Sequence, residues 1–157
     1  MDARYIAHYV ESVRAVFSSM VQMPVRFGDP KVRTAAQSYD ISGIIGMSGD
    51  VVGSVSLRMN EAVARAVVGK FAGLSCGIDE PDFLDAMGEL VNMVSGAAKA
   101  KFEGKNVSIS TPSVVVGAGH RIACPVRTTC VSLPCVLECG EFSLDIAIRE
   151  EGLAQAA

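Results

Sequence analysis

The two halves of this chain repeat one arrangement, a helix followed by strands, and that repeat limits the folds open to it. Moving the second half back by 78 positions places Glu89 on Glu11 and Val91 on Val13. Near the end of each half, apolar residues alternate along a strand beside a glycine-containing turn. Chance similarity between amphipathic helices is the competing explanation, but agreement at both ends of each half favours a duplication. We therefore expect an α+β fold, in which two α–β pseudo-repeats form one antiparallel sheet packed against helices.

Apolar residues at helical spacing predict three helices. The expected ranges are 2–21, with Asp2 as its cap, 61–72, with Asn60 as its cap, and 82–103, with Asp82 as its cap. The third has the clearest apolar stripe, which runs through Leu84, Met87, Leu90, Val91, Val94 and Ala98.

Alternating apolar residues predict strands on both sides of the third helix. The region 31–60 is β-rich with a turn at 48–50, and later strands are expected at 107–110, 113–117, 127–133, 135–139 and 141–149. In the last strand Leu144, Ile146 and Ile148 face one way, while Ser143, Asp145 and Ala147 face the other. His120 is expected in a turn between strands, and the residues after Glu150 in a short frayed tail.

Length and charge limit the class of protein. The 157 residues suit one domain spanning 1–157. The net charge of −3, with both signs interspersed, gives no basic surface for nucleic acid or an anionic membrane. The charged start lacks the apolar segment of a secretory signal, and no apolar run approaches the ~20 residues of a membrane helix. A cytoplasmic protein is therefore expected.

The chain has five cysteines, at positions 76, 124, 130, 135 and 139. Their number is odd, none forms a C-x-x-C pair, and no histidine stands at ligand spacing from them. Buried reduced thiols of a cytosolic protein are therefore expected, rather than a zinc site or a disulfide framework.

One narrow stripe of the third helix is polar. At about 100° per residue, Glu89 lies about 40° and Asn92 about 20° from Asp85, and Gly96 falls on the same stripe one turn below Asn92. A polar stripe is ordinarily a solvated helix face. Asparagine is a poor residue for an exposed helix interior, however, and glycine costs up to about 1 kcal/mol there. We therefore expect another molecule to approach this stripe closely.

The motif Asp85-x3-Glu89-x2-Asn92, with 22 residues between Glu89 and Pro112, resembles that of the CheC/CheX/FliY phosphatases of bacterial chemotaxis. The first helix and the stretch 110–120 are also similar to CheX proteins, so the resemblance covers almost the whole chain, read as a single CheX-like domain. In the first half, Arg14 stands where Asn92 stands in the second. An arginine cannot replace a small carboxamide, so one working site per chain is expected, as in CheX-type members.

The resemblance implies a phosphatase that acts on the aspartyl phosphate of a CheY-like response regulator. Asn92 would orient the attacking water and Glu89 would pair with a lysine of the regulator, while Asp85 and Gly96 would contribute to docking. No metal or other cofactor is expected on this chain, because the regulator would supply its own magnesium ion. The resemblance also implies a homodimer formed through an edge of the sheet.

Two other readings remain. The same fold could act as a non-catalytic CheC-like interaction or adaptor module in flagellar or two-component signalling. A conventional hydrolase would need a positioned histidine, and the only candidates are His8 and His120. The sequence has neither a G-x-G-x-x-G nor a Walker-type loop on which nucleotide binding could depend.

Overall fold

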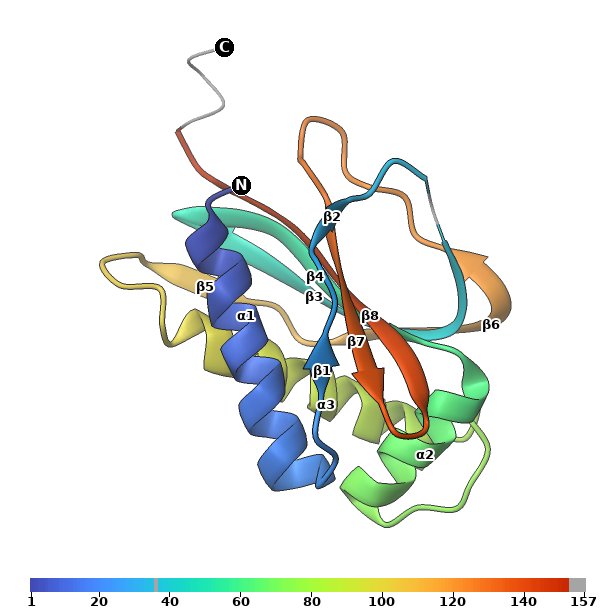
Figure 1. The fold of residues 1–157 in the computed structure, drawn as a ribbon. Coiled ribbons are helices and arrows are strands. Elements are labelled where there is room, and N and C mark those ends of the chain that lie inside the picture. The colour runs from blue at the N-terminus through green and yellow to red at the C-terminus, as the bar shows by residue number, and fades with distance from the viewer. Residues whose placement is uncertain (36, 153–157) are drawn as a thin grey trace.

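The computed structural model describes residues 1–35 and 37–152. Its helical elements are α1 (Ala3–Val16), the π-helical turn η1 (Phe17–Val21), α2 (Glu61–Ala72) and α3 (Pro81–Lys99). Its strands are β1 (Arg26–Phe27), β2 (Lys31–Val32), β3 (Ser38–Gly49), β4 (Val51–Met59), β5 (Val107–Ile109), β6 (Ser113–Arg121), β7 (Val131–Leu137) and β8 (Gly140–Glu150). The expected α+β class is confirmed (Figure 1).

The eight strands form one antiparallel sheet that shows the predicted duplication. Each half contributes a helix, two outer strands and a hairpin, which is β3–β4 in the first half and β7–β8 in the second. The strands β4 and β8 lie side by side at the centre, with Val55 opposite Ile146 and Leu57 opposite Leu144. The outer strands are exchanged, because β1 and β2 pair with β7 whereas β5 and β6 pair with β3. The two pseudo-repeats therefore complete each other's edges.

The three helices cover one face of the sheet (Figure 1). Helix α1 packs along α3, and α2 contacts both α3 and the π-helical turn. The core lies between helices and sheet, and it includes Tyr9, Phe17 and Leu90, each fully buried. Phe17 stacks on Phe142 of β8 with ring centroids 4.9 Å apart, so the two halves share one core.

The helix boundaries follow local capping chemistry. The Asp2 carboxylate accepts a hydrogen bond from Arg4 N at 2.8 Å, which confirms it as the cap of α1. Asn60 is the cap residue of α2, but the carboxylate that bonds the exposed Glu61 N–H belongs to Asp40, at 2.8 Å. The cap predicted at Asp82 is wrong. Helix α3 begins at Pro81, one residue before the predicted start, and its cap residue is Glu80, because proline fits the first helical position.

The strand boundaries correct three other predictions. His120 lies inside β6 rather than in a turn, since that strand runs on through Gly117 and Gly119. The strand expected at 127–133 begins only at Val131. Pro134 does not interrupt β7, because it lies between the positions where β1 and β2 pair with that strand. Most of the tail expected after Glu150, residues 153–157, lies outside the described residues.

The sheet face opposite the helices is polar but not open to solvent. Ser143, Asp145 and Ala147 of β8 face away from the helices as predicted, yet all three are buried. Residues 33–35, Gln37 and the segment 121–130 cover them, held there by hydrogen bonds from Arg33 and Arg58. Both arginine side chains pair with Asp145.

Candidate catalytic and docking site on helix α3

Helix α3 lies unusually close to the sheet at one glycine. A Cβ added to Gly43 of β3 would stand 2.9 Å from Val91 Cγ1 and 3.5 Å from Met87 O. Only glycine at position 43 allows α3 to approach this closely. The contact fixes the rotation of the helix, so that Val91 faces the sheet and the opposite side of the helix faces outward.

The polar stripe is the outward side of α3. Asp85 and Glu89 are exposed, whereas Asn92 and Gly96 are half-buried. Asn92 lies about 4.5 Å beyond Glu89 along the helix axis, so both side chains can contact one partner group. No side chain or backbone atom would meet a Cβ added at Gly96 within 4 Å, so this part of the helix is open to close approach.

A hollow of about 440 Å³ lies beside the stripe. Its lining consists of Leu84, Asp85, Gly88, Glu89, Pro112 and Val114. A Cβ added at Gly88 would lie 3.2 Å from Pro112 Cγ, so the glycine allows Pro112 to pack directly on the helix. The fold thus places Pro112 beside Glu89, although 22 residues separate them in the chain. Asn92 is not among the residues that line the hollow.

The equivalent positions in the first half are occupied by internal contacts. Glu11 forms an ion pair with Lys101, which follows α3. The Arg14 guanidinium lies over the Phe27 ring, 5.3 Å from its centroid. Within the described part of the chain, by contrast, the side chains of Asp85, Glu89 and Asn92 take part in no ion pair or hydrogen bond. Only the second copy of the motif is therefore free to meet a partner.

His120 forms a hydrogen-bonded pair with Ser42, but the serine hydroxyl is buried and cannot act as a nucleophile on a substrate. Its Nε2 lies 2.7 Å from Ser42 Oγ, and its Nδ1 lies 2.9 Å from Gly117 O. Since a carbonyl oxygen only accepts, Nδ1 carries the hydrogen and Nε2 accepts from the serine. The Ser42 side chain is fully buried and also accepts from Arg58 Nε at 3.4 Å. The pair fastens β6 to β3, and it offers no support for a serine hydrolase.

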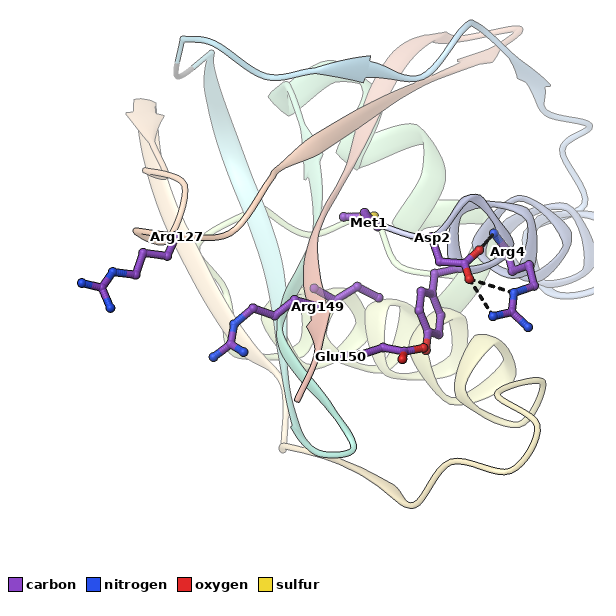
Figure 2. Close-up of a pocket in the computed structure, with 8 residues that line it drawn as sticks. Met1, Asp2, Arg4, Arg127, Arg149 and Glu150 are labelled. Carbon is purple, nitrogen blue, oxygen red and sulfur yellow. Dashed lines mark hydrogen bonds and ion pairs between the residues drawn. The ribbon is translucent and has the colours of Figure 1, made fainter. Parts of the chain in front are cut away.

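A second pocket, of about 340 Å³, lies at the start of α1 and the end of β8 (Figure 2). It is separate from the stripe, and many of its polar groups bond each other. Hydrogen bonds from Arg4 lower the pKa of the Asp2 carboxyl to about 2. The Tyr5 hydroxyl donates to Glu150 Oε1 at 2.7 Å, and that bond and the one from Lys105 lower the pKa of Glu150. Sequence patterns give no signal for this pocket, because its residues come from both ends of the chain.

The cysteines differ from the prediction of buried thiols. All five are free, but Cys139 is exposed and Cys76 and Cys124 are half-buried, which leaves only Cys130 and Cys135 buried. Among residues 1–35 and 37–152, no three His, Cys, Asp or Glu side chains are grouped so as to hold a metal ion. No helix in these ranges is long and apolar enough to cross a membrane.

Comparison with known proteins agrees with this fold. A family profile described as "Chemotaxis phosphatase CheX" matches residues 41–136. A CheC-like superfamily protein from Shewanella sp. PV-4 is 30% identical, with a TM-score of 0.84, over 95% of this chain and 99% of that one. A chemotaxis protein CheX from Desulfovibrio desulfuricans is 29% identical, with a TM-score of 0.82, over 94% of this chain and 99% of that one. A search of curated proteins found no match.

The same fold occurs in a structure of the CheX–CheY–BeF3–Mg2+ complex from Borrelia burgdorferi. That chain is 21% identical, with a TM-score of 0.78, over 93% of this chain and 98% of that one. At this identity the likeness shows the fold alone. The family profile, however, spans more than half of the present chain, and the Shewanella protein matches nearly its full length. This chain belongs to the chemotaxis phosphatase CheX family.

Proposed function

We propose that this protein removes the phosphoryl group from the aspartyl phosphate of a CheY-like response regulator. The observation that supports this most strongly is the pair Glu89 and Asn92 on the outward side of α3. Both side chains are uncommitted in the described structure, and both stand where another protein can approach. The description of the family as chemotaxis phosphatases points to the same reaction.

Asn92 is proposed to orient the attacking water. An aspartyl phosphate is a labile acyl phosphate, so the enzyme needs neither a nucleophile nor a strong base of its own. Water attacks the phosphorus in line, the bond from phosphorus to the aspartyl oxygen breaks, and inorganic phosphate leaves. A carboxamide can accept a hydrogen bond from that water and donate one to the phosphoryl group without ionising. Holding the water in line contributes through orientation.

Glu89 is proposed to pair with the lysine of the regulator's active site. Such a charge-assisted contact strengthens as the interface closes and water leaves. Asp85 lies one turn earlier on the same stripe and adds negative charge, while Gly96 leaves room for the partner's backbone. We expect the magnesium ion to belong to the regulator.

The hollow beside Glu89 gives the regulator a place to insert an apolar side chain. Leu84, Pro112 and Val114 supply apolar surface, and Asp85 and Glu89 supply carboxylates at its rim. A regulator segment that joins an apolar residue to a lysine would match both features. Burial of the apolar residue would contribute affinity, while the lysine would set the register.

Decay of a phosphorylated regulator tests the proposal. Candidate regulators are phosphorylated with acetyl phosphate, excess acetyl phosphate is removed, and loss of the phosphoryl group is followed with and without this protein. Faster decay supports the phosphatase. Binding of the phosphorylated regulator without faster decay would instead support the non-catalytic adaptor function.

We also propose that the protein forms a homodimer through β6. This outer strand is nine residues long, and β3 is its one partner among the described strands, so its other edge carries unpaired backbone groups. Val115 and Val116 of this strand are each 37% exposed. A long apolar edge strand is a ready site for pairing with a second strand. Val115→Lys places a charge on each copy of the edge, and it should convert a dimer to a monomer in light scattering. The matched variant Val52→Lys on β4 changes no edge, and a wild-type monomer would refute the dimer.

The cytoplasmic location expected from the sequence remains a prediction.

A further inference from the structure

A cluster of charged side chains that are almost fully shielded from solvent lies on the sheet face opposite the helices. The Asp145 carboxylate accepts from Arg33 Nη1 at 2.5 Å and from Arg58 Nη1 at 3.0 Å. The three side chains are at most 5% exposed. The hydroxyls of Ser132 and Ser143 each donate to Asp145 Oδ1 at 2.7 Å, so that oxygen is well satisfied.

The charges of this cluster do not cancel. Two guanidinium groups meet one carboxylate, which leaves one positive charge in a site with little water to screen it. Buried charge is costly unless a partner of opposite sign stands nearby. An anionic group beside Arg33 would therefore be stabilised there.

Arg33 also contacts two cysteine residues, Cys124 and Cys130, beside this cluster. Its Nε lies 3.2 Å from Cys124 Sγ, and its Nη2 donates to Ile122 O at 2.5 Å. Its backbone N–H donates to Cys130 O at 2.8 Å. Both cysteines line one narrow cavity together with Arg33 and Asp145. Burial, followed by the adjacent Cys124 side chain, raises the pKa of the Cys130 thiol to about 12.

From this arrangement we infer that Cys124 and Cys130 form a peroxide-oxidisable dithiol, which closes to a reversible disulfide. Cys124 is the half-exposed member of the pair and Cys130 is buried, so peroxide reaches the sulfur of Cys124 first. Its sulfur attacks one oxygen of hydrogen peroxide. The S–O bond forms, the O–O bond breaks, and the departing hydroxide leaves as water with the thiol proton of Cys124.

The second step joins the two sulfurs. Cys130 Sγ attacks the sulfenic sulfur of Cys124, the S–S bond forms, and the S–O bond breaks. The hydroxyl group leaves as water with the thiol proton of Cys130. Two thiols and one peroxide thus give one disulfide and two waters, which is the usual fate of a sulfenic acid beside a resolving thiol. In reducing compartments such disulfides are transient and redox-sensing rather than structural.

Two of the other cysteines, Cys135 and Cys139, serve as internal controls. Cys135 is buried in β7, where its thiol contacts Leu133 O at 3.5 Å. Cys139 is exposed in the β7–β8 turn and lies 4.0 Å from Met23 Sδ. Neither lines the cavity that Cys124 and Cys130 share. If exposure alone governed oxidation, Cys139 would be modified before Cys124.

Peptide mapping tests the inference. The protein is treated with one equivalent of hydrogen peroxide, free thiols are blocked in denaturant, and the sample is digested with trypsin without reduction. Cleavage after Arg121 and Arg127 puts Cys124 on peptide 122–127, and it puts Cys130 on peptide 128–149 together with Cys135 and Cys139. Fragmentation of the linked peptides by tandem mass spectrometry then identifies which of these three cysteines is bonded to Cys124. We expect two of the five thiols to be lost, the two peptides to be linked from Cys124 to Cys130, and dithiothreitol to separate them.

Two variants sharpen the assignment. Cys139→Ser should keep the link, whereas Cys130→Ala should lose it and leave Cys124 as a sulfenic acid that dimedone traps. If Cys130→Ala lowers the stability of the protein, the dimedone adduct on Cys124 still reports the first oxidation step. The peptide mapping of the wild type does not depend on that variant. Oxidation of Cys139 ahead of Cys124, or wild-type oxidation without the 124–130 link, would overturn the inference.

Discussion

Glu89 and Glu11 occupy equivalent positions in the two halves, yet their surroundings give them different roles. Glu11 is neutralised by Lys101, and its neighbour Arg14 covers the Phe27 ring. These contacts stabilise the packing of the first half. Glu89 has no such partner in the described structure and stands at the rim of the hollow that Pro112 helps to form. A charge left unpaired next to apolar surface is suited to a binding partner of opposite charge.

Reversing that charge should weaken binding of the regulator. Glu89→Lys replaces an attraction to the partner's lysine by a repulsion, and a charge-assisted hydrogen bond contributes about 1.5–3 kcal/mol. We therefore expect affinity to fall by roughly tenfold to a hundredfold, measured by titration calorimetry with a regulator held in its phosphorylated form. Glu103→Lys makes the same charge change in the exposed loop after α3 and is the matched control. Equal affinity for the wild type and Glu89→Lys would remove Glu89 from the interface.

At the scale of elements, the glycines determine how α3 meets its neighbours. Gly43 allows the helix to lie on the sheet, and Gly88 allows Pro112 to lie on the helix. Gly96 has neither function, since a Cβ there would meet nothing within 4 Å. A glycine in a helix interior without a packing function costs stability.

Alanine substitution should therefore separate Gly96 from Gly88. Gly96→Ala gains helix propensity at no steric cost and should raise the free energy of unfolding by about 0.5–1 kcal/mol. Gly88→Ala brings a Cβ to 3.2 Å from Pro112 Cγ and should lose most or all of that gain. Urea unfolding of both variants measures the difference. Equal stabilisation by the two variants would contradict the packing of Pro112 against Gly88.

The elements also show which parts of the fold a single sequence reveals. Helix α2 and the hairpins follow from periodicity, because each buries one regular apolar face. The strands β1 and β2 have two residues each, too few to show any period. The contact between Pro112 and helix α3 could be predicted only from the family motif, because no local sequence pattern shows that Pro112 packs against Gly88. The burial of Asp145 could not be predicted, since it depends on loops from distant segments.

At the scale of the whole molecule, Asp145 joins the two halves on the face away from the helices. It binds Arg33 and Arg58 of the first half, while it belongs to β8 of the second. Those arginines in turn hold the carbonyls of Ile122 and Gln37, and so they fix both covering loops. The cluster stabilises the same duplicated sheet whose other face supports α3.

Removing the charge of Asp145 should destabilise the whole domain. Asp145→Asn leaves two buried guanidinium groups without their carboxylate, and breaking a buried pair in this way costs about 3–5 kcal/mol. Glu61→Gln is the matched control, because it removes an exposed i,i+4 pair with Arg65 worth less than about 1 kcal/mol. Chemical denaturation compares the two. A loss for Asp145→Asn as small as that for Glu61→Gln would show that the cluster does not hold the halves together.

The proposed catalytic role of Asn92 leads to the most direct test of the proposed function. Asn92→Ala removes the carboxamide that would orient water but leaves Glu89, Asp85 and the hollow intact. Decay of the phosphorylated regulator should fall to its spontaneous rate, while affinity for the regulator stays within a few-fold of the wild type. Accelerated decay that is unchanged in Asn92→Ala would contradict the account.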